Sequence, residues 1–186
     1  HYDFVEFRKT PEDVKKFKEE HNLDALIGFQ TRNPVHNSHA FLMTNAVDTL
    51  LNSGEYKNPG LLLHPVSDVN QGGDINLNTR MLCYQSILPH LSQKGNALLS
   101  VLPYDMHMGG PAEAVMHAII RKNYGCTHFI TGRDHAGPSS NDSYGNKFYE
   151  EYEAQDYLLK VSDKIGIKIL PSPNVVYSDK KKTYIT

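Results

Sequence analysis

Short apolar runs alternate along the chain with longer helical segments. The runs predict strands at ALIGF (25–29), LLLH (61–64), LLSVL (98–102), THFIT (127–131) and IKIL (167–170). The longer segments predict helices at about 36–52, 77–88, 111–124 and 151–164, and Pro11 favours another at 11–20. Strands that are apolar almost throughout are typical of sheets covered on both faces. The pattern therefore predicts an α/β fold with a parallel sheet and helices on both faces.

Composition narrows the kind of ligand to expect. The 186 residues fit one domain with a real core, and 39% hydrophobic and 22% charged residues are ordinary for a globular protein. A net charge of −2 gives no overall basic bias towards nucleic acid or an anionic membrane, so neither is an expected partner. Any anion site must therefore be local, built from a few placed cations and backbone amides.

Other signals point to a reducing compartment. Cys83 and Cys126 lie far apart and form no CxxC pair, so we expect neither a disulfide framework nor a thiolate zinc site. No apolar run approaches the roughly 18–20 residues of a membrane span, and no signal peptide opens the chain. We expect a cytoplasmic protein, or one in an equivalent reducing compartment such as an organelle.

Two polar clusters follow predicted strands. QTRNPVHNSH (30–39) comes after the first strand and GRDHAGPSS (132–140) after the fourth. In open parallel sheets ligands bind at the carboxyl ends of the strands, where the strand order reverses. The two clusters are therefore expected at one ligand site.

The first cluster has the chemistry of an anion cradle. A helix is expected to begin just after Pro34, with His36 and His39 on one face of its first turn. Free N–H groups and the helix dipole favour an anion there, and the Arg32 guanidinium suits a tetrahedral oxyanion. Neutral donors come from Gln30 and Asn33. HxxH could also bind zinc or simply cap the helix, but no third metal ligand lies nearby in the sequence.

The second cluster suits a nucleotide. Gly132 permits close backbone approach, Arg133 can clamp a phosphate, and Asp134 can orient a neighbouring donor. Alone, this motif also fits a turn with a surface ion pair. Together, two anion-friendly loops at strand ends predict one nucleotide site.

The clusters also carry a family resemblance. QTRNPVHNSH resembles the QxRNPxHxxH signature of the ATP sulfurylase (sulfate adenylyltransferase) family, and GRDHAG resembles its second signature. The segments at 1–11, 64–80 and 113–137 are similar to the family as well, so the resemblance covers nearly the whole chain. It implies a Rossmann-like sheet of the HxxH nucleotidylyltransferase type.

The resemblance also implies an activity. The family joins sulfate to the AMP part of ATP, giving adenosine 5′-phosphosulfate and pyrophosphate. Sulfate would be held by Gln30, Arg32 and the backbone of Ala136. The reacting groups would be Thr31, Arg32 and Asn33 at the α-phosphate, with His36 and His39 on the phosphate chain. ATP would be bound by these first-cluster residues together with Gly132, Arg133, Asp134 and His135, and Val175 would lie near the adenine.

The expected mechanism is direct in-line attack of a sulfate oxygen on the α-phosphorus. Sulfate is deprotonated near neutral pH, so no general base is needed, and catalysis is mainly positioning and charge stabilisation. Mg²⁺ is expected with the ATP phosphates, and no metal site formed by the protein alone is expected. The resemblance fits both sulfate assimilation and the reverse reaction, which makes ATP in sulfur oxidation.

The domain organisation follows the same resemblance. Residues 1–186 are read as one catalytic domain, with an opening segment at 1–24, an α/β core at 25–170 and a C-terminal segment at 171–186. The family's usual N-terminal domain and closing subdomain are absent from this stretch. The start without Met fits a fragment or a processed product, and the family is commonly homo-oligomeric.

Some positions differ from the family pattern. Positions usually more basic hold Gln71, His107 and Ala112, and Ser172-Pro173-Asn174 replaces a more aromatic and basic triplet. His64 is expected near the site, whereas His117 and His128 are assigned structural roles. The alternatives are an adenylyltransferase for another oxyanion or acceptor, a nucleotide-binding regulatory module with little turnover, and an HxxH metal protein.

Overall fold

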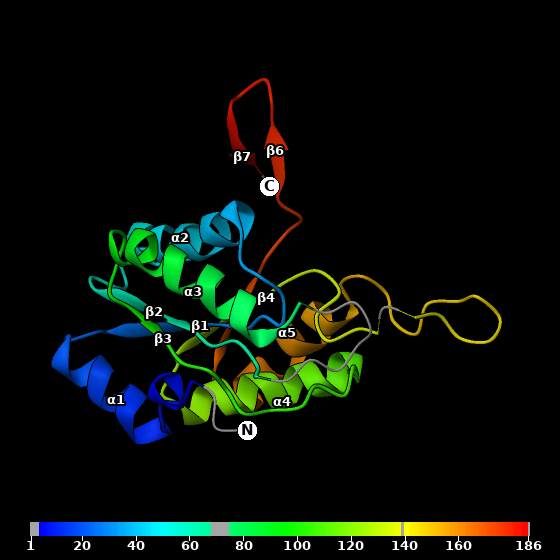
Figure 1. Ribbon diagram of the computed structural model, residues 1–186, viewed down its shortest axis with the longest axis horizontal. Coiled ribbons are helices and arrows are strands. Elements are labelled where there is room, and N and C mark those ends of the chain that lie inside the picture. The colour runs from blue at the N-terminus through cyan, green and yellow to red at the C-terminus, as the bar shows by residue number, and fades with distance from the viewer. Residues whose placement is uncertain (1–3, 68–74, 139, 186) are drawn as a thin grey trace.

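The computed structural model describes residues 4–67, 75–138 and 140–185. Its centre is a five-stranded parallel sheet in the order β3-β2-β1-β4-β5 (Figure 1). The strands are β1 (Ala25–Phe29), β2 (Pro59–Leu63), β3 (Ala97–Leu99), β4 (His128–Thr131) and β5 (Lys168–Pro171). The predicted α/β class and parallel sheet are confirmed.

Helices cover both faces of this sheet. They are α1 (Pro11–Glu20), α2 (Asn37–Asn52), α3 (Leu77–Ser92), α4 (Gly110–Asn123) and α5 (Glu153–Ile165), preceded by the short η1 (Val5–Phe7). Leu61 and Leu63 pack in a core with α2 and α3, whereas Leu62 faces a second core with α1, α4 and α5 (Figure 1). Successive strand residues point to opposite faces, so a continuous apolar run supplies both cores. Within the described residues, no helix is long and apolar enough to cross a membrane.

The strand order reverses at β1. This strand pairs with β2 on one side and with β4 on the other, and Phe29 is in register with both Leu63 and Ile130. The chain segments that leave β1 and β4 therefore begin side by side at the carboxyl edge of the sheet. Such a switch point is where open α/β sheets bind ligands.

Close packing joins β1 to α4. A Cβ atom on Gly28 would lie 2.8 Å from Cγ of Arg121, which is nearer than real Cβ contacts come. The Arg121 side chain is fully buried and crosses β1 at this point, with its guanidinium 5.7 Å from the centre of the Phe129 ring. Glycine at position 28 thus lets α4 lie directly against the strand that carries the first polar cluster.

Some element boundaries differ from the sequence prediction. α3 continues through Pro89 to Ser92. β3 has only three residues, although the amides of Ser100 and Leu102 still donate to the carbonyls of Leu63 and Pro65 beyond its end. The C-terminal segment contains an antiparallel hairpin of β6 (Val176–Ser178) and β7 (Thr183–Ile185), which stands away from the sheet in Figure 1. These strands are short and largely exposed, so the apolar pattern does not reveal them.

Candidate functional site

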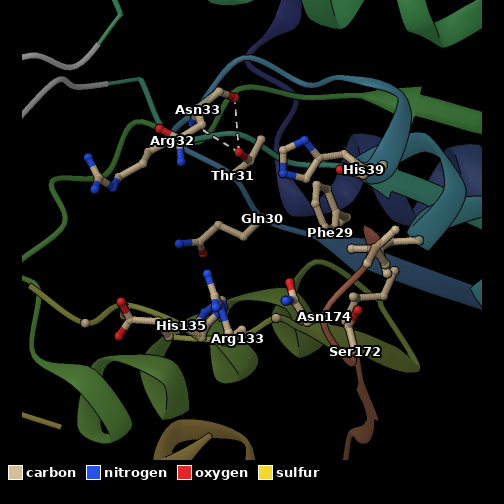
Figure 2. Close-up of a pocket in the computed structure, with 18 of the residues that line it drawn as sticks. Phe29, Gln30, Thr31, Arg32, Asn33, His39, Arg133, His135, Ser172 and Asn174 are labelled. Carbon is tan, nitrogen blue, oxygen red and sulfur yellow. Dashed lines mark hydrogen bonds between the residues drawn. The ribbon is translucent and has the colours of Figure 1, made fainter. Parts of the chain in front are cut away.

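A cleft of about 400 Å³ lies at the carboxyl ends of β1 and β4 (Figure 2). Its walls come from residues 30–36, named here the β1 loop, from residues 132–137, named the β4 loop, and from the chain after β5. All predicted site residues except His36 line it: Gln30, Thr31, Arg32, Asn33, His39, Gly132, Arg133, Asp134, His135, Ala136 and Val175. The structure therefore brings the two polar clusters together.

Side chains hold the β1 loop in shape. The Thr31 hydroxyl donates to the carbonyl of Asn33 at 3.1 Å and accepts from the amide of Asn33 at 3.0 Å (Figure 2). The hydroxyl of Tyr84, on α3, donates to the same carbonyl at 2.9 Å, and burial raises the pKa of Tyr84 to about 12. These bonds hold the residues on either side of Arg32 in place, so the Arg32 side chain leaves the backbone at a fixed position beside the cleft.

The two histidines of HxxH have different places. α2 begins at Asn37, so His36 is its N-cap residue rather than part of the first turn; it is exposed and is not among the described residues that line the cleft. His39 lies inside the first turn and lines the cleft, with its ring centre 4.1 Å from that of His36. The predicted shared face is present, but only His39 faces the cavity.

The backbone settles which nitrogen of His39 can donate. The amide of His36 donates to His39 Nδ1 at 3.3 Å, so Nδ1 acts as an acceptor. Burial, with a smaller contribution from the charge of His36, lowers the pKa of His39 to about 4. A neutral His39 therefore carries its proton on Nε2, where it is a hydrogen-bond donor.

The β4 loop takes its shape from its backbone. Asp134 and Ala136 adopt left-handed conformations, with φ of 51° and 60°. Such angles are uncommon for residues with a Cβ, and they persist where surrounding contacts fix them. The amide of Asp134 donates to the carbonyl of Glu151 at 2.6 Å, and the amide of Gly110 donates to the carbonyl of Ala136 at 2.9 Å.

Charge in the β4 loop is more exposed. Arg133 lines the cleft, but its side chain is 49% exposed and lies 3.9 Å from the Glu151 carboxylate. Asp134 contributes the only carboxylate among the described residues that line the cleft. The cavity is therefore dominated by cations and neutral donors, as an anionic ligand requires.

The chain after β5 closes a third side. Ser172, Asn174 and Val175 line the cleft. Gln155, from α5, donates from Nε2 to the carbonyls of Thr131 and Ser172, both at 2.8 Å, which joins the ends of β4 and β5. Of the positions that differ from the family pattern, Asn174 thus lies at the site, whereas Gln71 lies outside the described residues.

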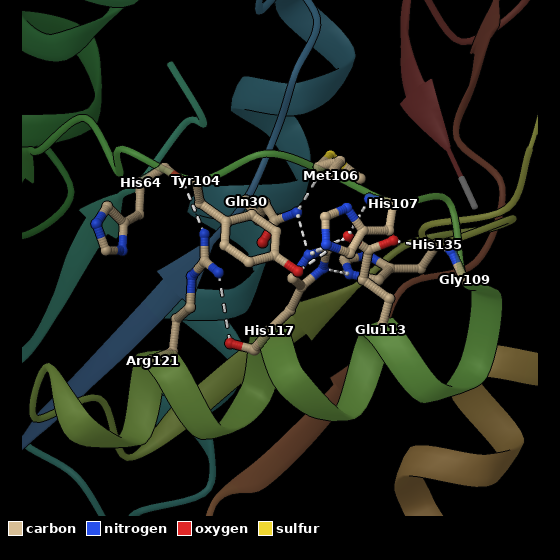
Figure 3. A network of polar contacts seen from close by, with 10 residues as sticks. All are labelled: Gln30, His64, Tyr104, Met106, His107, Gly109, Glu113, His117, Arg121 and His135. Carbon is tan, nitrogen blue, oxygen red and sulfur yellow. Dashed lines mark hydrogen bonds and ion pairs between the residues drawn. The ribbon is translucent and has the colours of Figure 1, made fainter. Parts of the chain in front are cut away.

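Beneath the cleft lies a buried polar network that the sequence did not indicate (Figure 3). His117, on α4, is fully buried; its Nε2 lies 3.3 Å from Nε2 of Gln30 and its Nδ1 lies 3.0 Å from Nε2 of His135. Glu113 Oε1 lies 3.4 Å from His117 Nε2. The i,i+4 spacing of Glu113 and His117 was visible in the sequence, but their position below the site depends on how α4 packs.

The groups around Glu113 keep it ionised. Tyr104 OH donates to Oε1 at 3.1 Å, the amide of His107 to Oε1 at 2.8 Å, and the amide of Gly109 to Oε2 at 2.9 Å. Burial alone would raise the pKa of Glu113, but the neighbouring His117 and the backbone amides of His107 and Gly109 lower it to about 2. His107 therefore contributes through its backbone, and it is not among the cleft-lining residues.

Two other histidines are neutral: His135 is half-buried in the cleft wall, and His64 lies in the core. Burial, together with the nearby charges of His117 and Arg121, lowers the pKa of His135 to about 3. His64 is fully buried against the ring of Tyr124, and neither ring nitrogen has a partner among the described residues. The expectation that His64 approaches the site is wrong, because its side chain points into the core. No group of three His, Cys, Asp or Glu residues in the described ranges is placed to hold a metal ion.

Known sequences match this chain along nearly all of its length. The sequence profile of the ATP-sulfurylase family matches residues 5–186. The chain is 42% identical over 185 residues to a sulfate adenylyltransferase of Yarrowia lipolytica, covering 100% of the chain and 31% of the relative. It is 42% identical over 184 residues to a sulfate adenylyltransferase of Schizosaccharomyces pombe, covering 99% of the chain and 36% of the relative.

Comparison with solved structures supports the fold. A chain described as a hexameric APS kinase from Thiobacillus denitrificans superposes with a TM-score of 0.72 and 21% identity, over 100% of this chain and 32% of that one. The chain therefore spans about a third of the length of the curated relatives and of the structure that it matches.

Proposed function

Because the chain belongs to the ATP-sulfurylase family, we propose that it transfers the adenylyl group of ATP to sulfate, giving adenosine 5′-phosphosulfate and pyrophosphate. The observation that carries this proposal is the cleft at the strand switch point. Arg32 in the β1 loop and Arg133 in the β4 loop line one cavity of about 400 Å³, beside the neutral donor His39 of α2, in a protein whose net charge is −2. Positive groups concentrated at this one place favour a polyanionic ligand.

Both loops contribute to each substrate subsite, the β1 loop mainly to sulfate and the β4 loop mainly to the nucleotide. Gln30 and Arg32, with the backbone of Ala136, hold sulfate, and the β4 loop with Val175 holds the nucleotide. Thr31 and Asn33 set the backbone beside the α-phosphate, because the Thr31 hydroxyl is already bonded to Asn33 at both donor and acceptor. His39 donates from Nε2 to the phosphate chain. His36 acts indirectly: its backbone amide donates to His39 Nδ1 and so orients the His39 ring.

The reaction in this geometry is a single displacement. A sulfate oxygen forms a bond to the α-phosphorus while the bond from that phosphorus to the bridging oxygen breaks, and pyrophosphate leaves with the electron pair. No protein atom becomes covalently attached and no proton must be removed from sulfate. The charge that develops on the leaving group meets Arg32 and the neutral His39, so catalysis rests on positioning and electrostatic stabilisation.

Mg²⁺ fits as a companion of the ATP phosphates rather than as a protein-held ion. Asp134 is the only carboxylate among the described cleft-lining residues. Mg²⁺ commonly uses one or two carboxylates together with substrate phosphates and waters. When bound, it would neutralise charge on the phosphate chain. By analogy with the family we also propose a homo-oligomer working in the cytosol or the reducing interior of an organelle.

The test is pyrophosphate release from Mg-ATP with and without sulfate, with inorganic pyrophosphatase present to draw the reaction forward. Wild type, Arg32→Ala and the control Lys16→Ala are compared; Lys16 is an exposed cation on α1. Sulfate-dependent release that Arg32→Ala abolishes and Lys16→Ala preserves supports the proposal. ATP binding without release favours a regulatory module, and release with molybdate or selenate but not with sulfate favours another oxyanion.

A further inference from the structure

The His117 side chain reaches both halves of the cleft from below (Figure 3). Its Nε2 lies 3.3 Å from Nε2 of Gln30, directly after β1, and its Nδ1 lies 3.0 Å from Nε2 of His135, in the β4 loop. The ring is fully buried and is not among the described residues that line the cleft. It can therefore influence a ligand only through these two neighbours.

We propose that His117 is a positioning residue that sets Gln30 for sulfate and His135 for the nucleotide, and that it couples the two substrate subsites. This inference rests on the proposed function, in which Gln30 and His135 belong to different substrates. His117 is thus more than the structural core residue that its place in the sequence indicates.

The surroundings fix the imidazole from below. The Glu113 carboxylate lies 3.4 Å from Nε2, and Arg121 donates from one guanidinium nitrogen to the backbone carbonyl of His117 at 3.4 Å. Arg121 donates from its other terminal nitrogen to the carbonyl of His64 at 2.9 Å, which ties this part of α4 to the end of β2. The Gln30 amide nitrogen can only donate, so His117 Nε2 accepts from it, and the neutral ring carries its proton on Nδ1, which donates to His135 Nε2.

Gln30 needs this support. Its side-chain oxygen is buried and has no hydrogen-bond partner among the described residues, so its amide is held through the nitrogen. Among the described residues, that nitrogen has two contacts, His117 and the sulfur of Met106 at 3.7 Å. Sulfur is a weak acceptor, so His117 is the stronger of the two contacts that orient the amide.

Two substitutions separate the two contacts. The amide of an asparagine side chain reaches the position of a histidine Nδ1, and that of a glutamine reaches the position of Nε2. His117→Asn therefore keeps a partner for His135 and removes the one for Gln30. His117→Gln keeps a partner for Gln30 and removes the one for His135.

The expected kinetics differ between these variants. Loss of one oriented hydrogen bond should raise the affected KM about tenfold. We expect His117→Asn to raise KM for sulfate with KM for ATP nearly unchanged, and His117→Gln to show the reverse. His128→Phe is the control, because it removes an equally buried imidazole at the opposite end of β4. It should leave both KM values within about twofold.

A spectroscopic readout tests the contacts without turnover. In protein labelled with ¹⁵N, the Gln30 side-chain amide signals should move in His117→Asn, and the His135 ring signals should move in His117→Gln. Wild-type protein should show a scalar coupling across the hydrogen bond between His117 Nδ1 and His135 Nε2. Gln30→Met and His135→Phe assign the signals.

The outcomes are distinct. No sulfate-dependent pyrophosphate release from wild type refutes the proposed function, while the NMR signals still decide whether His117 holds both neighbours. Equal rises in both KM values for both variants would show that His117 acts only by packing, which overturns the proposal. Unmoved Gln30 and His135 signals overturn it too. If neither variant folds, absence of the wild-type coupling decides against it.

Discussion

The β1 loop and the β4 loop face each other across one cleft but are held in place by different means. Side chains hold the β1 loop: the hydroxyls of Thr31 and Tyr84 both bond to Asn33. Backbone contacts hold the β4 loop, in which Asp134 and Ala136 are left-handed. In the β1 loop, side-chain contacts fix the positions of the side chains that face the substrates. In the β4 loop, the backbone conformation instead turns peptide N–H and C=O groups towards the ligand. The comparison predicts that the first loop carries more of the chemistry and the second more of the binding.

The largest difference should appear between the two arginines. Arg32→Ala removes a donor to developing charge, which typically costs on the order of 10²–10³ in rate, and kcat should fall by that amount. Arg133→Ala removes a half-exposed group that already lies near Glu151, so KM for ATP should rise about tenfold with a smaller change in kcat. Steady-state kinetics of both variants measure this. If Arg32→Ala and Arg133→Ala lost equal amounts of kcat, the proposed difference between the two loops, chemistry in one and binding in the other, would be wrong.

The two histidines of HxxH should also separate. His39→Ala takes away the Nε2 donor at the cleft and should lower kcat on the order of 10²-fold. His36→Ala keeps the backbone amide that fixes His39 Nδ1, so its effect should be about tenfold smaller. A variant His39→Ala with near-full turnover would rule out the proposed role of His39.

Acid should destabilise the folded protein through one histidine on each side of the cleft. The pKa values of His39 and His135 are lowered from 6.5 to about 4 and about 3, mainly by burial. Between about pH 6.5 and pH 4 the unfolded chain binds more protons than the folded one, so the free energy of unfolding falls as pH falls. The loss should be on the order of a few kcal/mol.

Urea unfolding at pH 7 and pH 5 measures this loss. His39→Phe should reduce the difference between the two midpoints, because it removes one of the titrating groups. The same midpoint at both pH values in wild type would contradict the buried, neutral state of these histidines.

A smaller effect is expected where a side chain shapes the β1 loop. Tyr84→Phe removes the donor to the Asn33 carbonyl and should lower the free energy of unfolding by about 1 kcal/mol. Tyr157→Phe is the control, because Tyr157 is 47% exposed on α5. The midpoint of urea unfolding compares them, and equal stabilities would show that the Tyr84 bond contributes nothing.

The smallest effect should come from the backbone of the β4 loop. Glycine tolerates the left-handed conformation of Ala136, so Ala136→Gly should change the free energy of unfolding by less than about 1 kcal/mol. Ala118→Gly, in the buried interior of α4, should cost about 1 kcal/mol or more. Thermal unfolding of the pair tests this, and an Ala136→Gly variant that is the less stable of the two would mean that the β4 loop is unstrained.

The sequence predicts most of the sheet and much of the site, for reasons visible in particular residues. ALIGF is apolar throughout and becomes β1 at the predicted bounds, and the polar residues after it must lie at a strand end. The left-handed angles of Asp134 and Ala136 leave no such mark, because neither residue is glycine. The place of His117 beneath Gln30 depends on tertiary packing, which periodicity cannot report.

The missing side chain at Gly28 connects a change in the sheet to the cleft. Even an added methyl group there would press on Cγ of Arg121 and push α4 outward. His117 precedes Arg121 by one helical turn, so a shift of α4 would also move His117 relative to Gln30 and His135. A substitution in the core, at a residue that does not line the cleft, would thereby disturb both subsites at once.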